Sequence, residues 1–252
     1  ILEADIDSID YDRILEIYKD RTSDASDFTF VFVGNIDLEI LKPLVEKYIG
    51  GLPANGRKEE LYDHKITTRK GVYRNNFARD METPTGTEVI FYSGDIEAKQ
   101  RNAILMSFVQ QIMDIVYITE VREKEGGTYG VGVQGSIDHL PRGKFNLSIQ
   151  FNMSPERREE LTDIVIRELE KVAKEGPQEE HVEKVRSYML KSFDEQLKKN
   201  AAWSNWLMQY YFYGKDYYSN NIEILKSITK EEIRDFLAGL LKQGNFIEVS
   251  MI

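Results

Sequence analysis

Arg122 and Tyr129 are the residues of this chain whose types and spacing are best suited to chemistry. Between them stands Gly126-Gly127, a pair that predicts the end of a helix and a reversal of the chain into a strand. Side chains on the two sides of such a bend can point into one small volume. A guanidinium offers forked donors to a carbonyl or carboxylate, and a phenol hydroxyl can donate to a developing oxyanion. The spacing alone leaves a second interpretation open, in which Arg122 pairs with a nearby Glu and Tyr129 is packed.

Other motifs in the chain do not complete a catalytic pattern. Gly130-Val-Gly132-Val-Gln-Gly135 has the spacing of a dinucleotide-binding loop, but it lies inside an alternating strand instead of opening a helix. Close approach of another backbone, or a bulge, explains glycines in a strand better. The histidines His64, His139 and His181 are far apart, and the segment ending at His181 fits the inverted zinc motif H-x-x-E-H only if Pro177 is ignored. We therefore expect no metal site and no cofactor in this chain.

The composition argues against several classes of protein. The chain has 252 residues with 33 basic and 43 acidic side chains, and its net charge of −10 weighs against nucleic-acid binding, which depends on Lys and Arg. The absence of Cys rules out a disulfide scaffold, a cysteine-bound zinc and a thiol nucleophile. No apolar run approaches the roughly 18 residues of a membrane span. We expect neither a nucleic-acid partner nor a membrane span.

The elements that must position the Arg–Tyr pair are a long helix and a β-hairpin. Apolar residues at helical spacing predict a helix that begins at 93–95 and runs to about Glu125. Alternating segments at 128–137 and 144–152 predict an antiparallel hairpin. The pair would therefore lie where the helix passes into the first strand of the hairpin.

The rest of the chain is predicted to mix helices with strands. An apolar strand at 28–33, without alternation, indicates burial on both faces. Further helices are predicted at 11–21, 37–49, 154–176, 182–197, 201–213 and 230–241, and further strands at 72–79, 88–92 and 246–251. A polar segment at 53–70 is the one candidate linker. This order favours an α+β fold, with helices packed on one face of a largely antiparallel sheet in a single domain, 1–252.

The segment that carries Arg122 and Tyr129 resembles a motif of a known peptidase family. Residues 121–131 (VREKEGGTYGV) are similar to the Arg…Tyr motif of the pitrilysin, or insulin-degrading-enzyme-like (insulinase family), zinc metallopeptidases, found in the half of these inverzincins that lacks zinc. Residues 28–53 are similar to the opening of the family's C-terminal-type domain, and 176–203 to the terminal domain of its bacterial four-domain members. The resemblance spans nearly the whole chain.

This resemblance implies a fold and a division of roles. The family's enzymes have two halves, each of two related α+β domains of the LuxS/insulinase-like fold, which enclose a chamber. The first half holds zinc on H-x-x-E-H and a distant Glu, and the last domain supplies an Arg and a Tyr that hold the peptide and help to polarise its scissile carbonyl. By motif, Arg122 and Tyr129 take these assisting catalytic roles, and Gly127 and Thr128 join them in substrate binding. Without H-x-x-E-H, the segment alone is expected to be inactive and to need the zinc of a full-length enzyme.

The resemblance thus implies the C-terminal, zinc-less domain of a longer zinc metalloendopeptidase. The expected partners are an extended peptide substrate, bound by strand addition at a sheet edge, and the N-terminal zinc-bearing half of the same polypeptide. Two alternatives stay open: a separate zinc-less partner subunit and a non-catalytic scaffold protein of the same fold. A start at Ile1 indicates a fragment of a longer chain, and by resemblance alone the location would be the bacterial periplasm or cell envelope.

Overall fold

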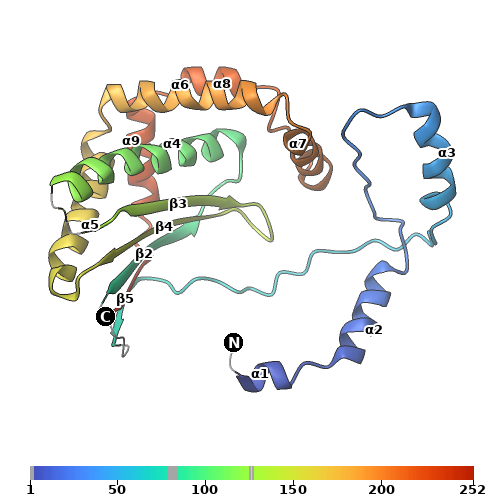
Figure 1. Cartoon of the computed structure of the whole chain (residues 1–252), viewed down its shortest axis with the longest axis horizontal. Coiled ribbons are helices and arrows are strands. Elements are labelled where there is room, and N and C mark those ends of the chain that lie inside the picture. The colour runs from blue at the N-terminus through green and yellow to red at the C-terminus, as the bar shows by residue number, and fades with distance from the viewer. Residues whose placement is uncertain (1–2, 79–84, 125, 127) are drawn as a thin grey trace.

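The computed structural model describes residues 3–78, 85–124, 126 and 128–252. It shows two parts, which we call the arm (residues 3–70) and the body (residues 71–252). The arm projects away from the body, and a long connection leads back from it to the first strand of the sheet (Figure 1). The predicted end of the long helix near Glu125 and the predicted substrate-contact residue Gly127 lie outside the described residues.

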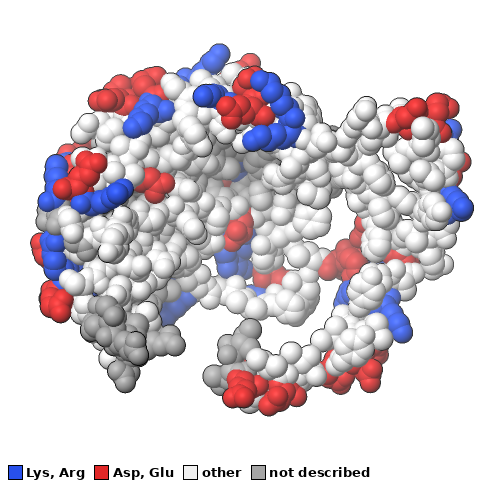
Figure 2. Space-filling model, viewed as in Figure 1, with Lys and Arg blue, Asp and Glu red and all other residues white. Residues whose placement is uncertain are grey.

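The arm contains three helices that bury none of their side chains. These are α1 (Glu3–Asp7), α2 (Tyr11–Thr22) and α3 (Leu38–Tyr48). Carboxylates begin the two longer helices: the Asp10 side chain accepts a hydrogen bond from the Arg13 N–H, and the Asp37 side chain accepts one from the Glu39 N–H. The predictions of helices near 11–21 and 37–49 are confirmed. Acidic side chains gather on α1 (Figure 2).

The predicted strand at 28–33 is wrong for this structure. The segment is extended, but it belongs to none of the strands in the described part of the chain. Its phenylalanines Phe28, Phe30 and Phe32 are 43%, 44% and 50% exposed, so burial on both faces is also wrong. The local pattern has the apolar content of a strand, but a strand forms only beside a partner.

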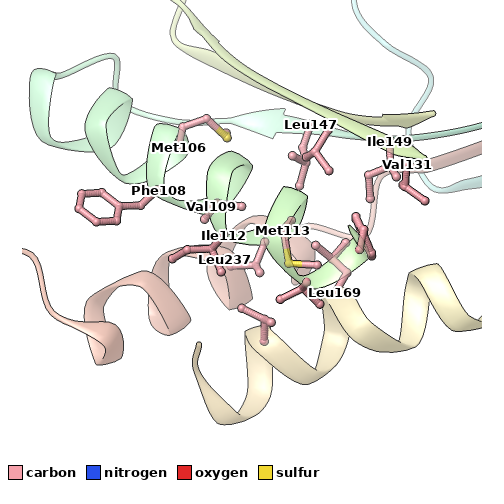
Figure 3. Close-up of a cluster of buried hydrophobic side chains, with 14 of the residues drawn as sticks. Met106, Phe108, Val109, Ile112, Met113, Val131, Leu147, Ile149, Leu169 and Leu237 are labelled. Atoms are coloured by element: carbon pink, nitrogen blue, oxygen red, sulfur yellow. The ribbon is translucent and has the colours of Figure 1, made fainter. Parts of the chain in front are cut away.

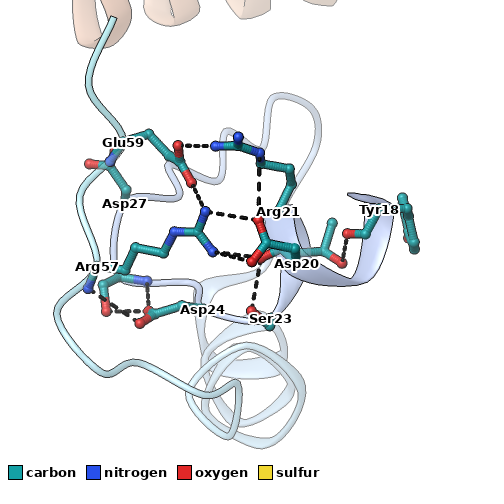
Figure 4. Close-up of polar contacts among 10 residues, drawn as sticks. Tyr18, Asp20, Arg21, Ser23, Asp24, Asp27, Arg57 and Glu59 are labelled. Atoms are coloured by element: carbon teal, nitrogen blue, oxygen red, sulfur yellow. Dashed lines mark hydrogen bonds and ion pairs between the residues drawn. The ribbon is translucent and has the colours of Figure 1, made fainter. Parts of the chain in front are cut away.

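Polar contacts tie the end of α2 to the returning chain (Figure 4). The Asp24 carboxylate accepts hydrogen bonds from the Ser26 hydroxyl and from the N–H groups of Asn55 and Arg57. These bonds, above all the one from the Ser26 hydroxyl, lower the pKa of Asp24 to about 2. Arg57 also bridges to Asp20, with an Nη2–Oδ2 distance of 3.1 Å. The arm is therefore held together locally by its own polar groups.

The body is built on one five-stranded sheet. Its strands are β1 (Val72–Phe77), β2 (Gly86–Asp95), β3 (Val131–Asp138), β4 (Lys144–Met153) and β5 (Phe246–Met251). They lie in the order β1-β5-β2-β4-β3, in which β1 and β5 are parallel and every other pair is antiparallel. The last strand of the chain therefore lies inside the sheet, between β1 and β2.

Helices cover one face of this sheet (Figure 1). They are α4 (Gln100–Tyr117) with its π-helical continuation η1 (Ile118–Glu123), the 3₁₀ turn η2 (Pro155–Arg157), α5 (Arg158–Glu175), α6 (Glu179–Gln196), α7 (Asn200–Tyr213), α8 (Asn221–Ser227) and α9 (Lys230–Leu241). The predicted α+β fold, with a largely antiparallel sheet and helices on one face, is confirmed. The predicted start of the long helix at 93–95 is wrong, because Ser93 to Asp95 pair with β4.

The core lies between α4 and the sheet (Figure 3). From α4, Ile112 and Met113 are fully buried, as are Leu147 and Ile149 of β4. Each such side chain stabilises the fold by about 1.5–3 kcal/mol. The fit is close: a Cβ on Gly135 would lie 2.5 Å from the Met106 Sδ, so the segment packed on this glycine is a side chain of α4 and not the backbone that was predicted.

The same central helix has the length and composition of a membrane span. Among the described residues one segment, Gln100–Glu123, is long and apolar enough for this: it contains 18 consecutive residues with a mean hydropathy of 1.3, and 56% of these are buried inside the protein. The expectation that no apolar run reaches this length overlooked the segment. Its apolar side chains are accounted for by the core that they form with the sheet.

Candidate functional site

Arg122 lies on η1, where the central helix widens into a π-helical turn. Such turns are rare and occur frequently at functional sites. Its neighbour Val121 is fully buried and holds the turn against the core, whereas Arg122 is exposed. No acidic residue in the described ranges pairs with Arg122, and the nearby Glu120 instead binds Lys124 at 2.6 Å. The interpretation in which Arg122 is paired with a local Glu therefore finds no such pair among the described residues.

The bend after η1 holds Tyr129 out in solvent. Gly126 has a φ of +62°, a backbone conformation that favours glycine, and its N–H donates to the Arg122 carbonyl at 3.1 Å. The Thr128 hydroxyl donates to the Gly130 carbonyl at 3.0 Å and accepts from the Gly130 N–H at 3.2 Å. Thr128 thus fixes the backbone on both sides of Tyr129, whose side chain is 96% exposed. The packed interpretation of Tyr129 is wrong.

Arg122 and Tyr129 line the same cavity. Its volume is about 520 Å³, and its walls also include Thr128 and the end of β4. The complete lining of described residues is Thr85, Arg122, Gly126, Thr128, Tyr129, Asn152, Met153 and Ser154. The structure therefore brings together three of the four predicted site residues, and the fourth, Gly127, is outside the described part.

A second, smaller cavity continues from Tyr129 along the open face of the sheet. It has a volume of about 250 Å³ and runs over β3 and β4. Gly130 and Gly132 line it without side chains that would fill the space, while Gln150 and Asn152 of β4 give it a polar wall. Sequence reasoning missed these β4 residues. Their period-two alternation with buried neighbours was the signal, since alternate side chains of a strand share one face.

The free edge of β3 is partly closed by α4. The Val133 N–H donates to Asp114 Oδ1 at 3.3 Å, and the Gly135 N–H donates to Gln110 Oε1 at 3.3 Å. Burial raises the pKa of Asp114, and the hydrogen bond from Val133 opposes this shift. Both edge donors already have partners, so a peptide could add as a strand here only by displacing them. We predicted that a peptide binds by strand addition at a sheet edge. At these two positions of β3, the existing hydrogen bonds disfavour it.

The described residues do not form a zinc site. His139 is hydrogen-bonded through Nε2 to the Tyr217 hydroxyl at 2.9 Å, and His64 and His181 lie on other segments. Within the described ranges, no three His, Asp or Glu side chains are placed to hold one ion. We assign no chemical step to a metal in this chain.

Comparison with known proteins places the chain in a family. A profile described as the peptidase M16 inactive domain matches residues 8–189. A zinc protease PQQL-like protein of Arabidopsis thaliana is 21% identical over 82% of this chain, which corresponds to 23% of that protein.

Solved structures share the fold. The ferredoxin protease FusC, solved in complex with Arabidopsis ferredoxin, matches 99% of this chain with a TM-score of 0.79 and 18% identity, over 27% of its own chain. The periplasmic protease PqqL of Escherichia coli matches 87% of this chain with a TM-score of 0.74 and 16% identity, over 24% of its own chain. The chain thus spans about a quarter of the length of these relatives.

Proposed function

The chain belongs to the peptidase M16 family, and we propose that it is the zinc-less C-terminal domain of a longer zinc metallopeptidase, in which it binds the substrate peptide. The part of the family that it matches is the inactive domain, and its relatives are named zinc proteases. Zinc belongs, in this proposal, to residues outside the chain, on the N-terminal half of the same polypeptide. When bound there, it would supply the activated water for peptide-bond hydrolysis.

One observation carries the proposal: Arg122 and Tyr129 line a single cavity, and both are exposed. Neither side chain has a hydrogen bond or ion pair to another described residue that would have to break before substrate binds. A scaffold protein has no need of an exposed guanidinium and an exposed phenol that line one open cavity. The exposure of both groups therefore favours a substrate-binding role over a scaffold of the same fold.

Each group has a distinct task in this proposal. The Arg122 guanidinium donates to a peptide carbonyl or carboxylate and orients the chain, because its fork can form two bonds at once. The Tyr129 hydroxyl donates to the carbonyl oxygen on which negative charge develops. Thr128 joins them in substrate binding in this proposal, and its hydroxyl, which is bonded to both the carbonyl and the N–H of Gly130, also holds the backbone beside Tyr129.

The peptide is proposed to lie on the open face of β3 and β4, in the small cavity beside Tyr129. Gly130 and Gly132 leave room for a backbone there, and Gln150 and Asn152 offer amides to bind it. The N–H groups of Val133 and Gly135 at the edge of β3 already have acceptors, which favours peptide binding on this face over strand addition at the edge. By analogy with periplasmic PqqL, we place the enzyme in the periplasm or cell envelope.

The proposal is tested by kinetics of the complete peptidase on a peptide substrate. Arg122→Ala is expected to raise KM, and Arg122→Lys to restore part of the binding, because lysine keeps the charge but not the fork. Arg167→Ala is the matched control, since Arg167 is an exposed arginine on α5, in the helical layer. Equal kinetics for Arg122→Ala and Arg167→Ala would remove Arg122 from the site.

A further inference from the structure

The arm repeats the pattern of the last helix and strand of the body. Helices α2 and α9 have 12 residues each. Each begins at a residue whose side chain accepts from the N–H three positions on: Asp10 from Arg13 in the arm, and Thr229 from Glu232 in the body. Both capping residues follow a Ser-Ile pair. After a short turn, each helix leads to six extended residues that begin with Phe, 28–33 and 246–251.

Matching positions of the two units differ in burial. Counted from the capping residue, Ile9, Ile14 and Tyr18 of the arm correspond to Ile228, Ile233 and Leu237 of the body. The arm residues are 62%, 53% and 63% exposed, whereas the body residues are 1%, 0% and 0% exposed. The arm therefore presents in solvent the same apolar stripe that α9 buries against the rest of the body.

The extended segments differ in the same way. In the body, β5 pairs with β1 on one side and with β2 on the other. In the arm, Thr29 to Val33 form no backbone hydrogen bond with any described strand, and the alternate phenylalanines are exposed. Unpaired N–H and C=O groups beside apolar side chains are satisfied by pairing within a sheet.

We infer that the arm completes the sheet of a second domain with the same fold as the body. Residues 28–33 would lie between two of its strands, as β5 lies between β1 and β2, and α2 would cover that sheet as α9 covers this one. The exposed apolar side chains of α3, such as Leu38 and Ile40, extend the same contact surface. The arm thus acts as a donated strand and helix that lock two domains together.

The occupant is a domain of the same longer polypeptide and not a second copy of this chain. In a second copy, the position between β1 and β2 is already filled by β5. The relatives are about four times as long as the matched region, which leaves length for further domains. This pairing requires the longer polypeptide of the proposed function, but it assigns no role to Arg122 or Tyr129.

Hydrogen–deuterium exchange of the full-length polypeptide tests the inference without any activity assay. The amides of 29–33 are expected to exchange roughly 10³-fold or more slowly than those of the connection at 66–69, and at rates close to those of 247–250, because sheet amides exchange only on opening. In the chain 1–252 alone, the amides of 29–33 are expected to exchange as fast as the connection. Fast exchange of 29–33 in the full-length polypeptide would overturn the inference.

A pair of matched variants of the full-length polypeptide gives a second readout. Phe30→Asp places a charge in the proposed interior, while Leu61→Asp places one on an exposed residue of the connection. We expect Phe30→Asp to speed exchange of 29–33 at least tenfold and Leu61→Asp to leave it unchanged. Protection of 29–33 in the chain 1–252 that rises together with dimer formation would assign the arm to a second copy and overturn the choice of occupant.

Discussion

Replacing Tyr129 by Phe separates catalysis from stability. The Tyr129 side chain is 96% exposed and its hydroxyl has no partner in the described part of the chain, so the free energy of unfolding should change by less than about 0.5 kcal/mol. For a domain of this size, that is a shift in Tm of about 1–2 °C. Loss of one donor to a developing oxyanion costs about 10²–10³-fold in kcat, or about 2.7–4 kcal/mol. The catalytic effect should therefore exceed the effect on stability at least fivefold.

The chain offers the opposite case as a control. Tyr117, the last residue of α4, is fully buried, and its hydroxyl donates to the Val165 carbonyl at 3.0 Å. Tyr117→Phe removes this hydrogen bond, which the carbonyl accepts in addition to its bond within α5, so it should destabilise the fold by about 0.5–1.5 kcal/mol and change kcat less than twofold. The assay is hydrolysis of a quenched fluorescent peptide by the complete enzyme, with thermal unfolding of each variant. A Tyr129→Phe variant with unchanged kcat, or with losses that follow its Tm, would refute the reasoning.

Three further changes probe the fold and its titratable groups. Gly135→Val drives a side chain into Met106 and should cost about 1–3 kcal/mol in urea unfolding. Gly132→Val should cost far less, because its Cβ would meet the Gln150 carbonyl oxygen at an ordinary contact distance of 3.8 Å; equal costs would contradict the close approach at Gly135. Burial raises the pKa of Glu88, so the folded state loses stability as pH rises above the unfolded value; Glu88→Gln should raise Tm at pH 8 and not at pH 4, and a gain at both values would point to another cause. The Asp24 pKa of about 2 lies below its ordinary 3.8, so its stabilising contribution is present above pH 3.8 and is lost as pH falls through 2. Asp24→Asn should speed amide exchange at residues 55–57 at pH 7, and unchanged exchange would show that those bonds do not hold the arm.

The bounds of a helix or strand could be predicted from the sequence wherever local residues mark both of its ends. The helix at 230–241 and the strand at 246–251 were predicted to the residue, because Thr229 caps the helix and a polar turn separates the two. The start of α4 was predicted wrongly, because Ser93 to Asp95 resemble a helix cap but are held in β2 by pairing with β4. The segment 28–33 has the composition of a strand, yet whether it pairs depends on a partner that its own residues do not specify.

Part of the candidate site could likewise be predicted from the sequence, and part could not. Arg122, Tyr129 and the glycine bend between them are neighbours along the chain, so their convergence could be predicted from spacing. The polar wall of the smaller cavity could not be predicted, because Gln150 lies opposite Gly132 only through the register of β3 on β4. A sequence marks which strand residues alternate, but the face that they share becomes known only when the partner strand is known.

The place of β5 in the sheet has a consequence for the biosynthesis of the protein. Residues 246–251 are translated after all the other strands of this sheet, yet they join β1 to the remaining strands. A nascent or truncated chain that ends before Phe246 has no neighbour for β1 and leaves one side of β2 bare, which is a surface that aggregates or recruits chaperones. Loss of residues 246–251 should therefore dismantle the sheet as a whole, and quality control of this protein is expected to act on chains that lack this strand.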